Sequence, residues 1–273
     1  MKILLTGANG FLGARILARM QAQPSVTLRG MSQDDMSRYI DEVQPDAIIH
    51  TAAISDIGTC EANPEASYHA NVLLPVYLAK AAPNSKLVML STDQVYNGNP
   101  SPGPYREGDE TIPGNLYARH KLEMEQRVLD ISPGAVLLRA TWMYDMPLYQ
   151  GDNRGNFLMN IIKSVLAGQP TAWSREQYRG LTYVREAAEA MTGALQLAGG
   201  VYNFGSENSM NMYDTAQFLL SAMGAKGHLL EAGVRGNLWM DCEKARLSGV
   251  AFLNTQEGLA RCLADYGMGA PGK

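Results

Sequence analysis

The sequence has few of the residues that mark a disulfide framework or a metal centre. Its 273 residues include three cysteines, an odd number, with no spacing typical of metal ligands. The four histidines, His50, His69, His120 and His228, are scattered in the same way. We therefore expect buried or incidental thiols, structural or solvated histidines, and no metal site.

Long apolar runs and an excess of basic charge are also missing. No apolar stretch approaches the roughly 20 residues that a membrane-spanning helix needs. The apolar run at the N-terminus has no basic region before it and glycines interrupt it at once, so we interpret it as a strand and not as a signal peptide. Lys and Arg number 23 against 27 Asp and Glu, a net charge of -4 without a basic patch. We expect a soluble, cytoplasmic protein with neither nucleic acid nor a membrane as partner.

Strand-like and helix-like patterns alternate through the first half of the chain. The predicted strands are residues 2–6, 26–28, 47–50, 86–90 and 135–138. The predicted helices are residues 11–21, 36–43, 64–82 and 115–130. This alternation predicts an α/β fold, a doubly wound parallel sheet of the Rossmann-like kind, with ligands at the edge where the strands' carboxyl ends meet.

The second half of the chain is less regular. It gives helices at 157–167, 185–197 and 212–223, a sixth strand at 201–204, and a Gly-rich stretch at 224–237 that is hard to place. We expect a dinucleotide-binding core at 1–145, rejoined by about 182–205. The remainder, 146–181 and 206–273, is expected to form a smaller C-terminal substrate lobe.

A glycine-rich turn, GANGFLG, follows the first predicted strand. Its three glycines would allow a tight turn, close approach of a pyrophosphate to the backbone, and close packing of helix on strand. The helix that follows would offer free N–H groups to the phosphates. We expect the dinucleotide to contact Gly7, Asn9, Gly10, Phe11, Leu12 and Gly13.

The acidic residue that often binds the ribose 2′-hydroxyl is absent after the second predicted strand. The strand ends in Leu28-Arg29-Gly30, without a carboxylate. Arg29 could pair with a 2′-phosphate instead, or it could be an exposed arginine at a strand end. The first interpretation favours NADP(H) over NAD(H) as the cofactor.

Tyr117 and Lys121 lie four residues apart in the predicted helix LYARHKLEMEQ, so their side chains share one helical face. A free phenol has a pKa of about 10, and a nearby ammonium favours the phenolate, so we expect Lys121 to lower the pKa of Tyr117. Thr92 follows the fourth predicted strand and would hydrogen-bond a substrate carbonyl. Together they predict nicotinamide-dependent carbonyl chemistry, although a surface tyrosine on an amphipathic helix is the alternative.

The motifs TGANGFLG, PDAIIHTAA, STDQVYNG, LYARHKLEMEQ and LRATWMY together resemble the extended short-chain dehydrogenase/reductase superfamily. Within it, the chain is most similar to the dTDP-4-dehydrorhamnose reductase family. The resemblance implies catalytic roles for Thr92, Tyr117 and Lys121. It also implies cofactor contacts, beyond the glycine turn, from Ala52, Ala53, Asn71, Ser91, Tyr117 and Lys121.

The same resemblance implies a substrate site for a nucleotide sugar. Its expected members are Asp93, Gln94, Val95, Trp142 and Arg235. We expect Arg235 to meet an anionic group such as a diphosphate, because a chain of net charge -4 needs a local cation for such a ligand. The chain departs from the family pattern at Gln94, Asn97 and Gly236, which leaves the particular sugar open.

Three functions remain open from the sequence. The leading one is an NAD(P)H-dependent reductase of a 4-keto sugar nucleotide or a similar carbonyl, with Tyr117 as proton donor. The second is a sugar-nucleotide epimerase or dehydratase, although the acidic pair expected of dehydratases is incomplete because Gln94 follows Asp93. The third is a non-catalytic, NADP-binding regulatory subunit, as the resembling partner chains of methionine adenosyltransferase are. A homodimer is compatible with each.

Overall fold

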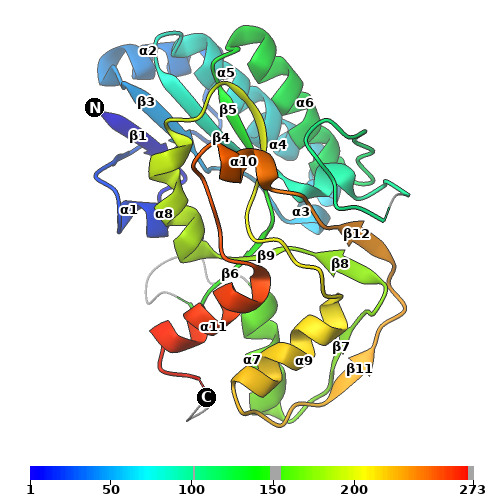
Figure 1. The fold of residues 1–273 in the computed structure, drawn as a ribbon. Helices are drawn as coiled ribbons and strands as arrows, with labels where there is room; N and C mark the ends of the chain where they lie inside the picture. Colours follow the sequence, from blue (N-terminus) through cyan, green and yellow to red (C-terminus); the bar gives the residue numbers. More distant parts are fainter. Residues whose placement is uncertain (101, 148–154, 270–273) are drawn as a thin grey trace.

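A six-stranded parallel sheet forms the centre of the computed structural model, which describes residues 1–100, 102–147 and 155–269 (Figure 1). The strand order is β10-β5-β4-β3-β1-β2, and every neighbouring pair is parallel. The strands are β1 (Ile3–Thr6), β2 (Gln23–Pro24), β3 (Ala47–His50), β4 (Lys86–Thr92), β5 (Val136–Ala140) and β10 (Gly200–Phe204). The predicted fold class is confirmed, and the order of strands reverses between β1 and β3, where such sheets bind ligands.

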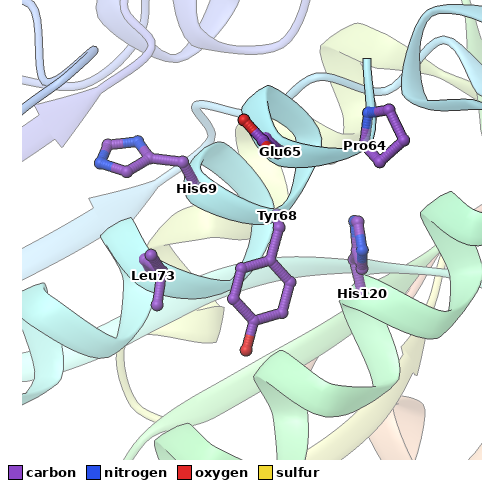
Figure 2. Close-up of a pocket in the computed structure, with 6 residues that line it drawn as sticks. All are labelled: Pro64, Glu65, Tyr68, His69, Leu73 and His120. Atoms are coloured by element: carbon purple, nitrogen blue, oxygen red, sulfur yellow. The ribbon is translucent and has the colours of Figure 1, made fainter. Parts of the chain in front are cut away.

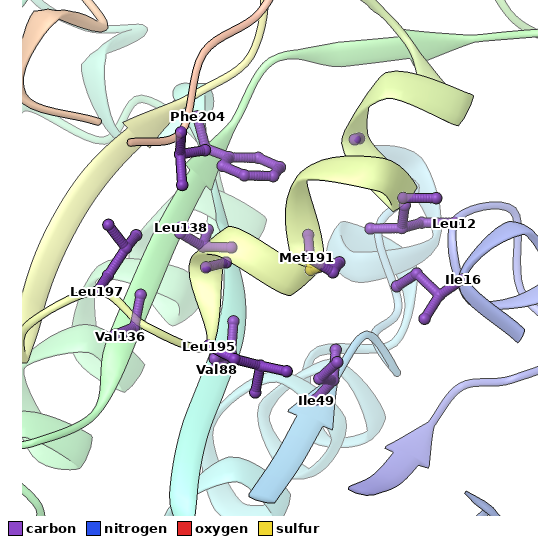
Figure 3. Packing of buried hydrophobic residues seen from close by; sticks show 14 of the residues in the cluster. Leu12, Ile16, Ile49, Val88, Val136, Leu138, Met191, Leu195, Leu197 and Phe204 are labelled. Carbon is purple, nitrogen blue, oxygen red and sulfur yellow. The ribbon is translucent and has the colours of Figure 1, made fainter. Parts of the chain in front are cut away.

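Helices cover both faces of this sheet. One face carries α1 (Gly13–Leu17), α8 (Val184–Ala194) and α10 (Glu243–Leu247). Their apolar side chains pack on those of the strands, with Ile16 and Met191 both fully buried (Figure 3). The opposite face carries α2 (Gln33–Val43), α5 (Leu74–Ala81) and α6 (Leu116–Ile131). Burial on both faces explains why β3 reads as a continuous apolar run.

The second strand is not where the sequence predicts it. β2 pairs Gln23 with Leu4 and Pro24 with Leu5, whereas the prediction was residues 26–28. A proline is tolerated there because β2 lies at the edge of the sheet. Leu28 is buried against the α2 face from an irregular segment, so its apolar character reflects packing and not pairing.

Two predicted helices differ most in extent from the observed ones. Helix α1 has five residues and ends at Leu17, which is 40% exposed, four residues before the predicted end at residue 21. The single helix predicted over 64–82 is three segments: α4 (Pro64–Tyr68), the π-helical turn η1 (His69–Leu73) and α5. Helix α3 (Ile57–Ala62) precedes them and was not predicted.

A second group of elements lies beyond the carboxyl edge of the sheet (Figure 1). Three short parallel pairs contribute to it: β6 (Trp142–Tyr144) with β9 (Leu181–Tyr183), β7 (Thr171–Trp173) with β11 (Leu229–Glu231), and β8 (Gln177–Arg179) with β12 (Gly236–Leu238). Its helices are α7 (Phe157–Ala167), α9 (Met212–Ala222) and α11 (Thr255–Asp265). They share an apolar cluster with β6 and β9. We call these elements the lobe and propose it as the substrate lobe; α10, although within 206–273, packs on the sheet.

Among the described residues, no helix is both long and apolar enough to cross a membrane.

Candidate active site

The turn after β1 is built from bare backbone. Gly7 has a φ of +72°, and a Cβ there would lie 2.7 Å from the backbone nitrogen of Ala52. A Cβ on Gly13 would overlap the carbonyl oxygen of Gly7, to which the N–H of Gly10 donates at 2.9 Å. Only glycine allows this approach of the turn to α1 and to the loop after β3. A turn without side chains fits a dinucleotide pyrophosphate, and Asn9 within it is exposed.

The side chain of Asn71 stabilises the loop that follows β3 by two hydrogen bonds. Its side-chain Nδ2 donates to the carbonyl oxygen of Ile54 at 2.9 Å, and the N–H of Ile54 donates back to its Oδ1 at 3.1 Å. This reciprocal pair holds the segment that includes Ala52 and Ala53, both half-buried. Asn71 is fully buried in η1, so the π-helical turn is what carries its amide to the loop.

The three predicted catalytic residues all lie where β4 and α6 meet. Thr92 is the last residue of β4, and Tyr117 and Lys121 are buried on α6. The Lys121 ammonium donates to the carbonyl oxygen of Leu90 in β4 at 2.8 Å. Asn115 caps α6 by accepting from the N–H of Ala118 at 2.8 Å, which fixes the start of the helix at Leu116.

Burial governs the ionisation of this site. It raises the pKa of Tyr117, the Asp93 carboxylate raises it further, and the hydrogen bond with Thr92 acts in the opposite direction. Burial also lowers the pKa of Lys121 to about 8, against the opposing effect of the Glu125 carboxylate. The expectation that Lys121 lowers the pKa of Tyr117 is therefore wrong for the protein without a cofactor, because desolvation of the phenol outweighs the nearby charges.

A buried ion pair adjoins Thr92, and its arginine was missed in the sequence. Arg179 in β8 donates from Nε to Asp93 Oδ2 at 2.8 Å and from Nη2 to Oδ1 at 3.0 Å. Asp93 is fully buried and Arg179 is 19% exposed. The guanidinium also lies 5.2 Å from the ring centroid of Trp142. The partners are 86 residues apart, a separation at which no spacing rule could have joined them.

Other predicted site residues also have defined partners, and the side chain of Gln94 hydrogen-bonds to Asp93 itself. Gln94 Oε1 accepts from the side-chain amides of Asn97 at 3.1 Å and Asn115 at 3.2 Å. Val95, within η2 (Asp93–Tyr96), is fully buried in an apolar cluster. The Ser91 hydroxyl donates to Glu125 Oε1 at 2.5 Å, inside a buried network that includes Arg139.

The two arginines expected to bind anions lie on the surface. Arg29 is exposed, beyond the end of β2. Arg235, 82% exposed, pairs with Glu176 at 2.7 Å. Neither is brought to Tyr117 by a contact, and their roles stay predictions.

A hollow of about 620 Å³ lies on the outer side of α4 and α6 (Figure 2). Its lining residues are Pro64, Glu65, Tyr68, His69, Leu73 and His120. None of them is a predicted site residue. The Nδ1 atom of His120 shares a hydrogen bond with the Ser67 hydroxyl at 2.9 Å, as expected for a structural histidine.

Comparison with known proteins gives relatives that match most of the chain. The chain is 26% identical to the probable low-salt glycan biosynthesis reductase Agl14 of Haloferax volcanii, covering 94% of this chain and 91% of that protein. It is 28% identical to the dTDP-4-dehydrorhamnose reductase of Mycobacterium tuberculosis, over 82% of this chain and 76% of that one. It is 26% identical to methionine adenosyltransferase 2 subunit beta of Danio rerio, over 93% and 87%.

Solved structures share the fold. A dTDP-4-dehydrorhamnose reductase from Clostridium acetobutylicum superposes with a TM-score of 0.86 at 23% identity, over 98% of this chain and 100% of that one. The Bacillus anthracis enzyme in complex with NADP gives 0.85 at 23% identity, over 97% and 100%. The UDP-glucose 4-epimerase of Thermus thermophilus, in complex with NAD, gives 0.79 at 22% identity, over 97% and 99%.

The parallel sheet, its glycine turn and these similarities define an oxidoreductase of the extended short-chain dehydrogenase/reductase type, dependent on a nicotinamide cofactor. Within that class, residues 1–261 match the family model described as RmlD substrate binding domain, and the chain belongs to this family.

Proposed function

We propose that the protein is an NAD(P)H-dependent reductase of a 4-keto sugar nucleotide, or of a similar carbonyl compound. The observation that carries the proposal is the meeting of Thr92, Tyr117 and Lys121 at the carboxyl end of β4. The named reductases among the relatives support the substrate class.

In this proposal each of the three side chains has a separate task. Thr92 donates a hydrogen bond to the substrate carbonyl and orients it. A bound, reduced nicotinamide supplies the hydride. Tyr117 donates the proton to the carbonyl oxygen, and the raised pKa of its buried phenol keeps that proton available at neutral pH. Lys121, anchored on Leu90, donates to the ribose of the cofactor.

The alternative of a dehydratase is less well supported. Such an enzyme needs an acid next to the strand-four hydroxyl to protonate a leaving group. Both oxygens of Asp93 accept from Arg179, and the next residue, Gln94, is a neutral amide. A regulatory role remains the second candidate, because methionine adenosyltransferase 2 subunit beta of Danio rerio is similar over 93% of this chain.

The decisive experiment is to incubate the purified protein with a panel of nucleotide sugars, including 4-keto forms, and to follow NADH and NADPH oxidation. We expect turnover with at least one 4-keto sugar nucleotide. Tight NADPH binding with no turnover on any member would instead favour the regulatory role, with Tyr117→Phe as the inactive reference.

We also propose that the cofactor is NADPH, through Arg29. We expect Arg29→Ala to reduce the preference for NADPH over NADH, measured as the ratio of kcat/KM values, by about 10-fold, since a charge-assisted contact with a 2′-phosphate is worth roughly 1.5–3 kcal/mol when buried and less here. An unchanged ratio would make Arg29 an ordinary surface residue.

A further inference from the structure

The ion pair between Asp93 and Arg179 occupies the residue next to Thr92, yet the proposed reaction gives neither partner a task. The pair is held firmly. Arg179 belongs to β8, where Leu238 of β12 is its partner in the ladder, and its carbonyl oxygen accepts from Asn208 Nδ2 at 3.0 Å. Asp93 follows β4 directly. The pair therefore links the lobe to the carboxyl edge of the sheet.

The hydrogen bonds at Asp93 place it in competition for the hydrogen of Thr92. The Thr92 hydroxyl donates to Asp93 Oδ1 at 3.3 Å, a long contact for a carboxylate acceptor. Arg179 Nη2 donates to the same oxygen at 3.0 Å. The hydroxyl oxygen of Thr92 also accepts from the N–H of Gln94 at 3.2 Å. The same hydroxyl also shares a hydrogen bond with the Tyr117 phenol, so the Asp93 carboxylate holds the hydroxyl hydrogen only weakly.

We infer that Arg179 is a positioning residue for the reaction: by taking up both oxygens of Asp93, it leaves the hydroxyl hydrogen of Thr92 free for the substrate carbonyl. Without the guanidinium, a buried carboxylate would draw that hydrogen into a short, charge-assisted bond. Thr92 would then present an oxygen lone pair to the substrate oxygen, which repels it. The inference rests on the proposed reductase function at the same site.

A double-mutant cycle with Thr92 tests this task. Arg179→Gln should lower kcat at least 10-fold, while the Kd for NADPH, measured by fluorescence, stays within 2-fold. Thr92→Val removes the hydroxyl, so adding Arg179→Gln to it should cost little more, because both changes remove the same contact. If Arg179 had only a structural role, the fold-losses in kcat of the two single variants would multiply in the double variant.

Neutralising Asp93 provides the second arm. In the variant Asp93→Asn/Arg179→Gln no carboxylate competes for Thr92, so kcat should recover to within about 3-fold of the wild type. Arg179→Lys should rescue in part, since it retains the charge without the two-pronged geometry. The matched control is Arg175→Gln, which breaks an exposed Arg–Asp pair in the lobe, with Asp214, and should leave kcat unchanged.

The outcomes separate the two proposals. Multiplying losses in the cycle, or no recovery in the neutral pair, would overturn the role of Arg179 while leaving the reductase function in place. If Arg179→Gln does not fold, the kcat of Asp93→Asn/Arg179→Gln is compared with that of Asp93→Asn. Both variants lack the buried carboxylate, so this comparison still tests the role of Arg179. A wild type that reduces no ketone would overturn the reductase function, and the positioning role would fall with it.

Discussion

Tyr117 and Lys121 reach their positions through different anchors, although one helix carries both. Lys121 is tied to the main chain of β4, whereas the phenol of Tyr117 has Thr92 and the Asp93 charge as neighbours. This difference separates the consequences of removing them. The phenol is proposed to touch the reacting carbonyl, and the ammonium to serve both the cofactor and the phenol.

We predict that Tyr117→Phe lowers kcat by about 10²–10⁴-fold, the usual contribution of general acid catalysis, and leaves NADPH affinity nearly unchanged. Lys121→Ala should lower kcat and also weaken NADPH binding. The double variant should be little worse than either single one, because residues that act as a unit are not additive. Steady-state kinetics and cofactor titration measure both effects; near-full activity in Tyr117→Phe would refute the assignment.

His50 is a buried residue whose titration should be visible in stability. Its Nδ1 shares a 2.7 Å hydrogen bond with the Thr6 hydroxyl, and its Nε2 has no hydrogen-bond partner among the described residues. Burial and, to a smaller extent, the Lys121 ammonium lower the pKa of His50 to about 3. The folded protein therefore holds this ring neutral where an unfolded chain, with a pKa of about 6.5, takes up a proton.

We predict that the free energy of unfolding decreases as the pH is lowered below about 6.5. The unfolded state then binds a proton at His50, whereas the folded state binds it only when the pH is near 3. Between about pH 6 and 4, the slope should exceed that of His50→Asn by up to about 1.4 kcal/mol per pH unit, one proton's worth. Urea unfolding of both proteins at several pH values measures the slopes. Equal slopes would show that the ring is protonated in the fold.

At the scale of elements, the glycine turn after β1 brings three segments into backbone contact. We predict that Gly7→Ala destabilises the protein more than Gly168→Ala does. Both glycines have positive φ, which costs alanine roughly 1–2 kcal/mol. A Cβ on Gly7 would also meet the backbone of Ala52, whereas a Cβ on Gly168, beyond α7, would have nothing within 4 Å. Chemical denaturation measures the free energy of unfolding of both variants. Equal destabilisation would mean that the turn can shift to accommodate the added Cβ.

Some helices and strands could be predicted from the sequence and others could not. β3 and α7 lie where predicted, because a doubly buried strand is apolar throughout and α7 has an Asn156 cap and a Gly168 stop. The π-helical turn could not be predicted, since the bond of Asn71 to the Ile54 backbone that accompanies it joins residues 17 apart in the sequence. The lobe's three-residue strands were missed because they are too short to show an alternating pattern.

The residues of the candidate site also differ in whether the sequence could predict them. The glycine turn and the trio of Thr92, Tyr117 and Lys121 could be found because each lies in a local motif at the end of a strand or on one helix face. Arg179 could not be found, because only the folded lobe brings it to Asp93. The pKa of Tyr117 was predicted in the wrong direction, because a sequence reveals neighbouring charges but not the extent of burial.

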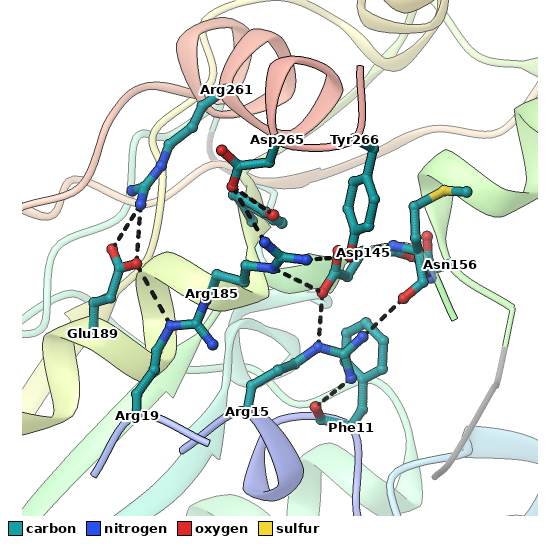
Figure 4. A network of polar contacts seen from close by, with 12 residues as sticks. Phe11, Arg15, Arg19, Asp145, Asn156, Arg185, Glu189, Arg261, Asp265 and Tyr266 are labelled. Carbon is teal, nitrogen blue, oxygen red and sulfur yellow. Dashed lines mark hydrogen bonds and ion pairs between the residues drawn. The ribbon is translucent and has the colours of Figure 1, made fainter. Parts of the chain in front are cut away.

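At the scale of the whole molecule, Asp145 joins the sheet, the lobe and the C-terminal segment (Figure 4). Its buried carboxylate accepts from Arg15 Nε of α1 at 2.8 Å and from the Tyr266 hydroxyl beyond α11 at 2.9 Å. Arg185 of α8 lies 3.8 Å away. Arg15 also donates from Nη1 to the carbonyl oxygen of Phe11, inside the glycine turn, at 2.8 Å. One carboxylate thus connects the lobe to the proposed cofactor site.

We predict that Asp145→Ala destabilises the protein by about 3–5 kcal/mol, because it leaves the buried Arg15 without its counter-charge. It should also weaken NADPH binding, since Arg15 then no longer fixes the carbonyl of Phe11. Tyr266→Phe is the matched control: it removes one neutral donor, should cost about 1 kcal/mol, and should leave NADPH affinity unchanged because Arg15 keeps its partner. Urea unfolding and fluorescence titration measure both quantities. If Asp145→Ala lowers stability while NADPH affinity stays at the wild-type value, the network serves the fold alone, and the glycine turn holds its shape without the lobe.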